Sequence, residues 1–164
     1  MDRFVEVTHR EWIAAPEERV RRQFADLQHH IDTHVHPKLK LEIVEQGARG
    51  ATYVQQVRLL GFWQRDVFVR SFTPDGVMVD TAVEGFNRGG SLRFRFGAET
   101  RAGVPGTEVE ITVRLPLPPL LGALVKPLLA AQVRRELGNA AAEDKHDLEV
   151  RGYPRAAVAR WRAA

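Results

Sequence analysis

Residues 120–148 read LLGALVKPLLAAQVRRELGNAAAEDKHDL and carry the strongest structural signal in the chain. Apolar side chains recur there at steps of three and four residues, a spacing that predicts one helix from about Pro119 to Glu149. Pro127 should bend the first third of this helix, because proline removes a backbone donor. The positions that follow the apolar spacing are Leu120, Leu121, Leu124, Val125, Leu128, Leu129, Val133, Leu137, Ala140, Ala141, Asp144 and Leu148.

The region before this helix has the two-residue period of β-strands. Short turns that contain glycine separate the segments, which predicts an antiparallel meander. One more strand is expected at the N-terminus, and Pro16 with the two acids after it predicts a helix that runs to about Asp32. The expected strands are 3–13, 39–45, 52–60, 62–72, 77–86, 92–99 and 108–115.

A sheet with one apolar face must bury that face against another element. The C-terminal helix, about 45 Å long at 1.5 Å per residue, is the only expected element of sufficient length. We therefore predict an α+β fold in which a seven-stranded antiparallel sheet wraps around a long C-terminal helix, with a cavity between them. Residues 1–150 are expected to form this single domain, and residues 151–164 a basic, flexible tail.

The element order, the segment AAPEERV (14–20) at the start of the first helix, and the apolar terminal helix resemble the helix-grip fold of the START/Bet v 1-like (SRPBCC) superfamily. Over residues 3–150, the chain resembles the bacterial polyketide cyclase/dehydrase and lipid-transport group of that superfamily. The resemblance implies that a hydrophobic ligand occupies the cavity between sheet and helix. Some members cyclise or aromatise substrates there, and the fold alone does not choose between binding and catalysis.

The charge is distributed unevenly. The chain has 24 Lys and Arg residues and 21 Asp and Glu residues, but four of the arginines lie in 151–164, which contains no acid. The remainder is nearly neutral, and a nucleic-acid-binding domain needs a concentrated basic face, so no nucleic acid partner is expected. The absence of cysteine excludes disulfides, thiolate metal sites and cysteine nucleophiles. No apolar signal-peptide segment is visible at the N-terminus, and a cytoplasmic location is expected.

Residues 115–131 (LPLPPLLGALVKPLLAA) form the most apolar segment. They number 17 and include four prolines and Lys126, whereas an integral membrane segment needs about 20 apolar residues. A buried helix that faces the cavity is therefore the expected structure. The alternative is a peripheral membrane or protein contact made by the apolar turn 116–121.

Both polar and apolar side chains are candidates for contacts with a ligand in the cavity. The polar candidates are Tyr53, Gln56, Arg58, Asp66 and Gln132. The apolar candidates are Phe94, Phe96, Leu124, Val125 and Leu128. The strand faces expected to point inward are those of Val77, Val79, Thr81 and Val83 and of Val109, Ile111 and Val113. Strand 62–72 has apolar residues on both faces, so its inward face stays undetermined.

Asp66 and Tyr53 are the candidates for catalysis. Asp66 interrupts an apolar strand, and if it faces the cavity, desolvation would raise its pKa and make it a general base, with Tyr53 or a histidine as its partner. The favoured alternative is a carboxylate on the solvent face, paired with an arginine of the adjacent strand. No serine lies in a G-x-S-x-G motif. No cofactor is expected.

Four of the six histidines fall in the octet HHIDTHVH (29–36). On a continuing helix, His30 and His34 would face the same side, and His36 or Asp32 could complete a metal site. The favoured alternative is that these histidines are exposed and cap the C-terminus of the first helix, so no metal is assigned.

The leading functional hypothesis is binding, or transport, of a hydrophobic small molecule such as a lipid, a quinone or a polyketide. One alternative is a cyclase or dehydratase that acts on a polyketide-like substrate in the same cavity. Another alternative is a module that contacts a membrane or a protein.

Overall fold

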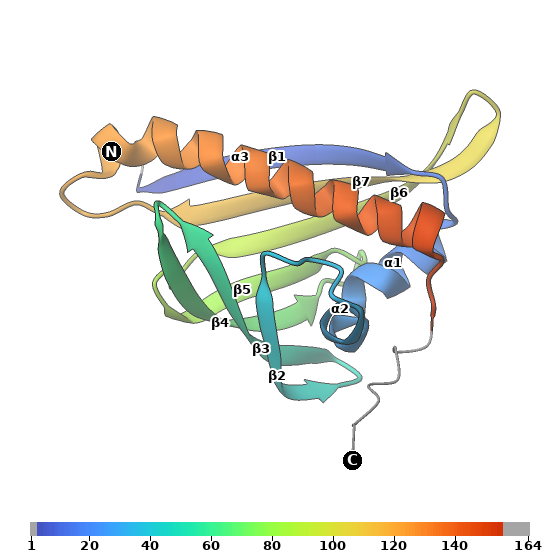
Figure 1. Ribbon diagram of the computed structural model, residues 1–164, viewed down its shortest axis with the longest axis horizontal. Coiled ribbons are helices and arrows are strands. Elements are labelled where there is room, and N and C mark those ends of the chain that lie inside the picture. The colour runs from blue at the N-terminus through green and yellow to red at the C-terminus, as the bar shows by residue number, and fades with distance from the viewer. Residues whose placement is uncertain (1–2, 156–164) are drawn as a thin grey trace, which may run out of the picture.

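Seven antiparallel strands form one sheet in the order β1-β7-β6-β5-β4-β3-β2, as the sequence predicts (Figure 1). The computed structural model describes residues 3–155, so most of the predicted tail, 156–164, lies outside the described residues. The strands are β1 (Phe4–Ile13), β2 (Lys40–Gly47), β3 (Gly50–Leu59), β4 (Phe62–Phe72), β5 (Met78–Gly85), β6 (Ser91–Arg101) and β7 (Val104–Pro116). Each expected strand is present, and most boundaries differ from the prediction by a few residues.

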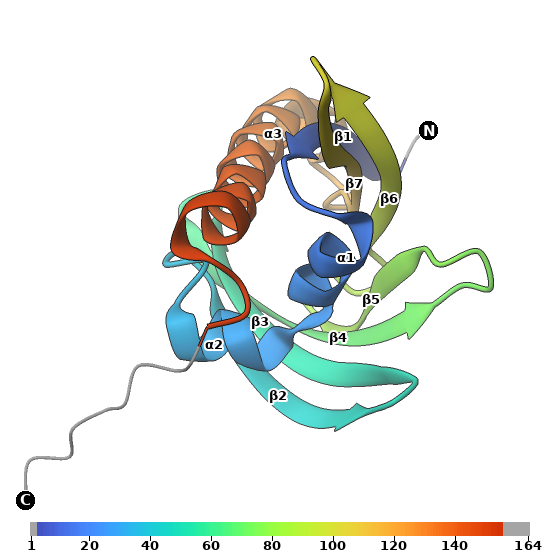
Figure 2. The same cartoon turned by 90° about the vertical axis from the view of Figure 1, so that its right-hand side faces the viewer.

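The long C-terminal helix α3 (Gly122–His146) lies along the concave side of the sheet and continues into the π-helical turn η1 (Asp147–Arg151). Its inward residues Leu129, Val133, Leu137 and Ala141 pack against β1 and β7 in one hydrophobic core. Figure 2 shows the sheet curving around α3 while two short helices close one end. The predicted α+β helix-grip architecture is therefore confirmed.

The first helical region is divided into two helices, α1 (Glu17–Ala25) and α2 (Leu27–Thr33), rather than being one helix that reaches Asp32. Asp26 separates them with ψ near 79°, and its side chain accepts a hydrogen bond from the backbone N–H of His29 at 2.9 Å. Aspartate is a preferred N-cap because its oxygen satisfies an amide of the first helical turn. Asp26 therefore ends one helix and starts the next at a new angle.

The inward face of β5 differs from the expected one. The structure also identifies the inward face of β4, which the sequence left undetermined. On β5 the inward residues are Met78, Asp80 and Ala82, whereas Val79 and Thr81 point the other way and Val83 is exposed. On β4 the even-numbered positions from Gln64 to Arg70 are buried, and the register with β5 shifts between Val67 and Phe68. The prediction for Val109, Ile111 and Val113 is correct, since all three lie in the core.

The core extends past residue 150. Tyr153 is 2% exposed and packs with the side chains of α1 and α2. None of the described helices is both long enough and apolar enough to cross a membrane.

Candidate ligand pocket

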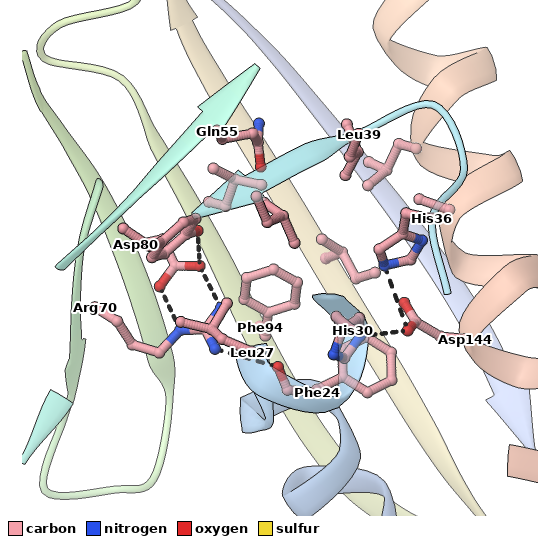
Figure 3. Close-up of a pocket in the computed structure, with 16 residues that line it drawn as sticks. Phe24, Leu27, His30, His36, Leu39, Gln55, Arg70, Asp80, Phe94 and Asp144 are labelled. Atoms are coloured by element: carbon pink, nitrogen blue, oxygen red, sulfur yellow. Dashed lines mark hydrogen bonds and ion pairs between the residues drawn. The ribbon is translucent and has the colours of Figure 1, made fainter. Parts of the chain in front are cut away.

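A pocket of about 100 Å³ lies where the sheet, α1, α2 and α3 meet (Figure 3). Most of its lining is apolar and includes Phe24, Leu41, Leu92, Phe94, Ile111 and Leu137. Ligand pockets for drug-sized molecules usually measure about 300–1,000 Å³. A lipid- or polyketide-sized ligand therefore enters only if lining side chains move.

One polar group of the pocket comes from the middle of the sheet, on β3, β4 and β5. Arg70 donates from Nε and Nη2 to the two carboxylate oxygens of Asp80, at 2.7 Å each, and Tyr53 donates its hydroxyl proton to Asp80 at 2.7 Å. Arg70 and Asp80 are direct neighbours across β4 and β5. Burial and the negative charge of Asp80 raise the pKa of Tyr53 well above its usual range. Tyr53 is therefore a neutral donor rather than a base.

The charge of Arg70 is also preserved. Burial lowers the pKa of Arg70, but the contact with Asp80 outweighs burial and the net shift is upward. Arg70 also donates to the carbonyl oxygens of Phe24 and Ala25 at the end of α1, at 3.3 and 3.2 Å. The arginine thus ties the first helix to the sheet beside the pocket.

A second polar group lies across the pocket, between α2 and α3, and consists of His30, His36 and Asp144 (Figure 3). His30 Nε2 is 3.1 Å and His36 Nε2 is 3.5 Å from Oδ1 of Asp144. Burial raises the pKa of Asp144, but the two imidazoles and Gln23 outweigh burial and the net shift is downward. Burial lowers the pKa of His36, but Asp144 and Glu143 outweigh burial and raise it. Asp144 is therefore held in its ionised form, and the two carboxylates favour the protonated form of His36.

These positions correct the expectations for the histidines. His29 and His30 are buried rather than exposed, and they contact Asp147 and Asp144 respectively. His34 ends α2 in the left-handed conformation at φ 50° and is exposed, so it does not pair with His30. Within residues 3–155, His30, His36 and Asp144 form a group that could hold a metal ion, because their ligand atoms lie within 4.8 Å of one another.

Two of the predicted polar ligand contacts lie on the wrong face of the sheet. Tyr53 lines the pocket, and so does Gln55, whereas Gln56 and Arg58 point to the opposite face of β3. Gln132 accepts a hydrogen bond from the backbone N–H of Leu60 at 2.8 Å. Arg58 and Gln132 instead line a separate surface hollow, together with Trp63.

Among the apolar candidates, Phe94 lines the pocket. Phe96 is half-buried and packs edge-on against Phe24, with ring centroids 5.5 Å apart. Leu124 and Leu128 are 77% and 64% exposed, and Val125 is half-buried outside the pocket. The two leucines miss the cavity because the inward stripe of α3 runs through Leu129, Val133, Leu137 and Ala141, which leaves them on another side of the helix.

Asp66 is buried, with 1% exposure, so it is not a carboxylate on the solvent face. It accepts hydrogen bonds from the backbone N–H of Asn87 at 2.6 Å and from the side-chain amide of Asn87 at 2.7 Å. It does not line the pocket that contains Tyr53. The structure therefore does not bring the proposed catalytic pair together, and Asp66 stabilises the turn after β5.

Sequence reasoning missed Gln55, Arg70 and Asp80, although it placed Asp144 within the inward stripe of the last helix. An aspartate at an apolar position of an amphipathic stripe is itself a signal, because a buried carboxylate requires partners. The partners could not be identified, since His30 and Asp144 are separated by 114 residues.

No protein-family model matches the chain, and no curated protein matches it either. A solved structure from Thermus thermophilus matches 86% of this chain and 94% of its own, with a TM-score of 0.73 and 19% identity. The Zhui aromatase/cyclase from a Streptomyces species matches 91% of this chain and 98% of its own, with a TM-score of 0.69 and 20% identity. A START superfamily protein from Mycobacterium smegmatis matches 82% of this chain and 92% of its own, with a TM-score of 0.64 and 16% identity.

Identities in this range show the fold alone. The TM-scores of 0.64–0.73 show that the arrangement of the sheet and the helices is similar to that of these three structures. The chain has the helix-grip fold of the START/Bet v 1-like superfamily.

Proposed function

We propose that the chain binds a hydrophobic small molecule in the pocket between the sheet and α3. The observation that carries this proposal is an interior pocket with an apolar lining and two polar groups on opposite walls. Binding sites for small molecules commonly combine an apolar lining with a few polar groups that fix orientation. The fold shared with an aromatase/cyclase and a START superfamily protein supports the same proposal.

The polar groups restrict the chemistry of the ligand. Arg70, Tyr53 and Asp80 already satisfy one another, so they offer little to a ligand without rearrangement. Gln55 lines the pocket and its amide can both donate and accept. A ligand with an apolar body and one or two oxygen atoms suits this arrangement. Small lipids, quinones and polyketides are ligands of this kind.

Filling the pocket with protein should weaken ligand binding. Ala140 lines the pocket from α3, and Ala140→Leu would add three carbon atoms to a space of about 100 Å³. We expect the affinity for a fluorescent fatty acid to fall by about tenfold or more, because the added side chain occupies the volume of the ligand. Displacement of the probe from the purified chain, together with native mass spectrometry for co-purified ligands, measures this effect.

The matched control is Ala131→Leu, which makes the same change at an exposed position of the same helix. It should leave probe affinity unchanged. Equal affinity in both variants, or no binding of any lipid, quinone or polyketide by the unmodified chain, would contradict the proposal.

A second candidate function is peripheral contact with an acidic lipid surface, and a specific observation favours it. Leu120, Leu121, Leu124 and Leu128 are exposed together at the start of α3, with Leu120 at 96%. An adjacent hollow is bordered by prolines and by Arg3 and Lys126. Exposed apolar side chains beside basic ones are typical of surfaces that lie on acidic membranes.

The double variant Leu120→Asp/Leu121→Asp should abolish binding to vesicles of phosphatidylcholine and phosphatidylserine, because it places carboxylates at an anionic surface. Co-sedimentation measures the bound fraction. The control Val44→Asp/Val150→Asp makes the same change at exposed apolar positions elsewhere, and it should bind as the unmodified chain does. Equal loss in both variants, or no sedimentation of the unmodified chain, would refute this second function.

A further inference from the structure

Two imidazole rings and a carboxylate converge on one point of the pocket wall. His30 comes from α2, His36 from the loop before β2, and Asp144 from the last turn of α3. The Nε2 atoms of the rings lie 3.1 and 3.5 Å from the same carboxylate oxygen. The side chains of His30 and Asp144 are only 7% and 5% exposed, so the group is largely sealed from solvent.

The other nitrogen of each ring is already committed. His30 Nδ1 lies 2.7 Å from the backbone oxygen of Asp26, and His36 Nδ1 lies 2.8 Å from a carboxylate oxygen of Glu143. A carbonyl or an ionised carboxylate can only accept, so each Nδ1 carries a proton. In the neutral ring, Nε2 is then an acceptor whose lone pair points toward Asp144.

Three acceptors that face one another need a positively charged species between them. Protonation of the rings is one solution, and a bound cation is the other. Histidines that ligate a metal usually donate their second ring proton to a carbonyl or a carboxylate, which fixes the tautomer and orients the ring. Asp26 and Glu143 provide these two acceptors, and the Gln23 amide donates to the Asp144 carboxylate at 3.0 Å.

The distances agree with a zinc ion. With ligand bonds of 2.0–2.2 Å, tetrahedral geometry places neighbouring ligand atoms about 3.3–3.6 Å apart. The separation of 3.5 Å between His36 Nε2 and Asp144 lies in this range, and that of 3.1 Å between His30 Nε2 and Asp144 is slightly shorter. Three protein ligands are typical of zinc sites that keep a fourth position open, and here that position faces the pocket, which the three residues line. A separate hollow bordered by His30, His34 and His36 provides an entry route from the surface.

We propose that His30 Nε2, His36 Nε2 and a carboxylate oxygen of Asp144 bind a divalent transition-metal ion, with the ligand chemistry of Zn²⁺, at the wall of the pocket. Water or an oxygen atom of a pocket ligand would take the fourth position. The proposal is independent of ligand binding, because the metal site can be tested with no organic ligand present.

The experiment uses the full chain without a polyhistidine tag, treated with EDTA and then titrated with Co²⁺. We expect one equivalent of Co²⁺ to produce the intense visible absorption of a four-coordinate site, and Zn²⁺ to abolish it by displacement. Zinc at about a hundred times its Kd should raise Tm by about 5–10 °C. A chain that shows no absorption and no Tm shift would overturn the proposal.

Three variants separate the proposed site from other histidines. His36→Gln removes a ligand at a half-buried position and should abolish the cobalt absorption. Glu143→Gln keeps the hydrogen bond to His36 but removes its charge, and it should weaken binding by about 10–100-fold. His34→Gln changes an exposed neighbour and should bind as the unmodified chain does.

Circular dichroism establishes that each variant is folded. Cobalt absorption that persists in folded His36→Gln, or that disappears in His34→Gln, would assign the metal to other residues and overturn the proposal. If His36→Gln does not fold, the metal affinity of Glu143→Gln is the test. An affinity equal to that of the unmodified chain would also overturn the proposal.

Discussion

Replacing Arg70 with methionine is expected to lower the free energy of unfolding by about 3–5 kcal/mol, because it leaves a buried carboxylate without its counter-charge. Asp80 is fully buried, and Arg70 holds both of its oxygens at 2.7 Å. The same substitution removes the donors to the carbonyl oxygens of Phe24 and Ala25 at the end of α1. Urea unfolding followed by circular dichroism measures the loss.

A second substitution tests the cause. Arg70→Met/Asp80→Leu removes both charges, so it should recover a large part of the stability that Arg70→Met loses, since paired apolar replacements of buried ion pairs are often tolerated. Arg10→Met removes the arginine of an exposed pair with Glu110 and should leave the stability nearly unchanged. If the double variant is no more stable than Arg70→Met, the buried charge is not the cause of the loss.

The order of the strands and the long helix could be predicted because local periodicity determines them. The turns that contain Gly61 and Gly76 predicted the bounds of β4, Phe62–Phe72, and steps of three and four residues predicted α3. The break between α1 and α2 could not be predicted in this way, because it depends on the cap at Asp26 rather than on a glycine or a proline. The apolar stripe continues across the break from Val20 to Leu27 and conceals it.

The inward face of β5 was predicted incorrectly because a buried polar residue inverts the usual pattern. On β5, Val79 and Val83 point outward, while Asp80 points inward and forms an ion pair with Arg70 of the adjacent strand β4. A pairing of this kind depends on strand register, which a single strand does not reveal. On β3 the candidates came from both faces, so Tyr53 lines the pocket, Gln56 and Arg58 do not, and Gln55 was missed.

The histidine cluster illustrates a further limit. Spacing on one helix suggested His30 with His34, but the helix ends at His34, and the chain then turns to bring His36 beside His30 with ring centroids 5.1 Å apart. The third member, Asp144, comes from the other end of the chain. Local spacing can identify residues of the right chemical type, whereas the fold determines which of them meet.

Shortening the chain after residue 150 should lower the free energy of unfolding by at least about 3–5 kcal/mol, the range seen when a large buried aromatic side chain is removed. Tyr153 is 2% exposed and packs edge-on against His29, with ring centroids 4.7 Å apart. Its hydroxyl donates to Asp26 at 2.9 Å, and its carbonyl accepts from Arg19 at 2.6 Å. The segment thus connects the end of α3 to the junction of α1 and α2.

The matched comparison is a chain that ends at residue 155, which retains these contacts and the ion pair between Arg155 and Asp147. It should unfold at the same urea concentration as the full chain. Burial and Asp26 raise the pKa of Tyr153 to about 12, so its hydroxyl stays a donor at neutral pH, and Tyr153→Phe should cost about 1 kcal/mol for the lost hydrogen bond. If the chains ending at 150 and 155 unfold together, the domain ends at residue 150 and the packing of Tyr153 contributes nothing to stability.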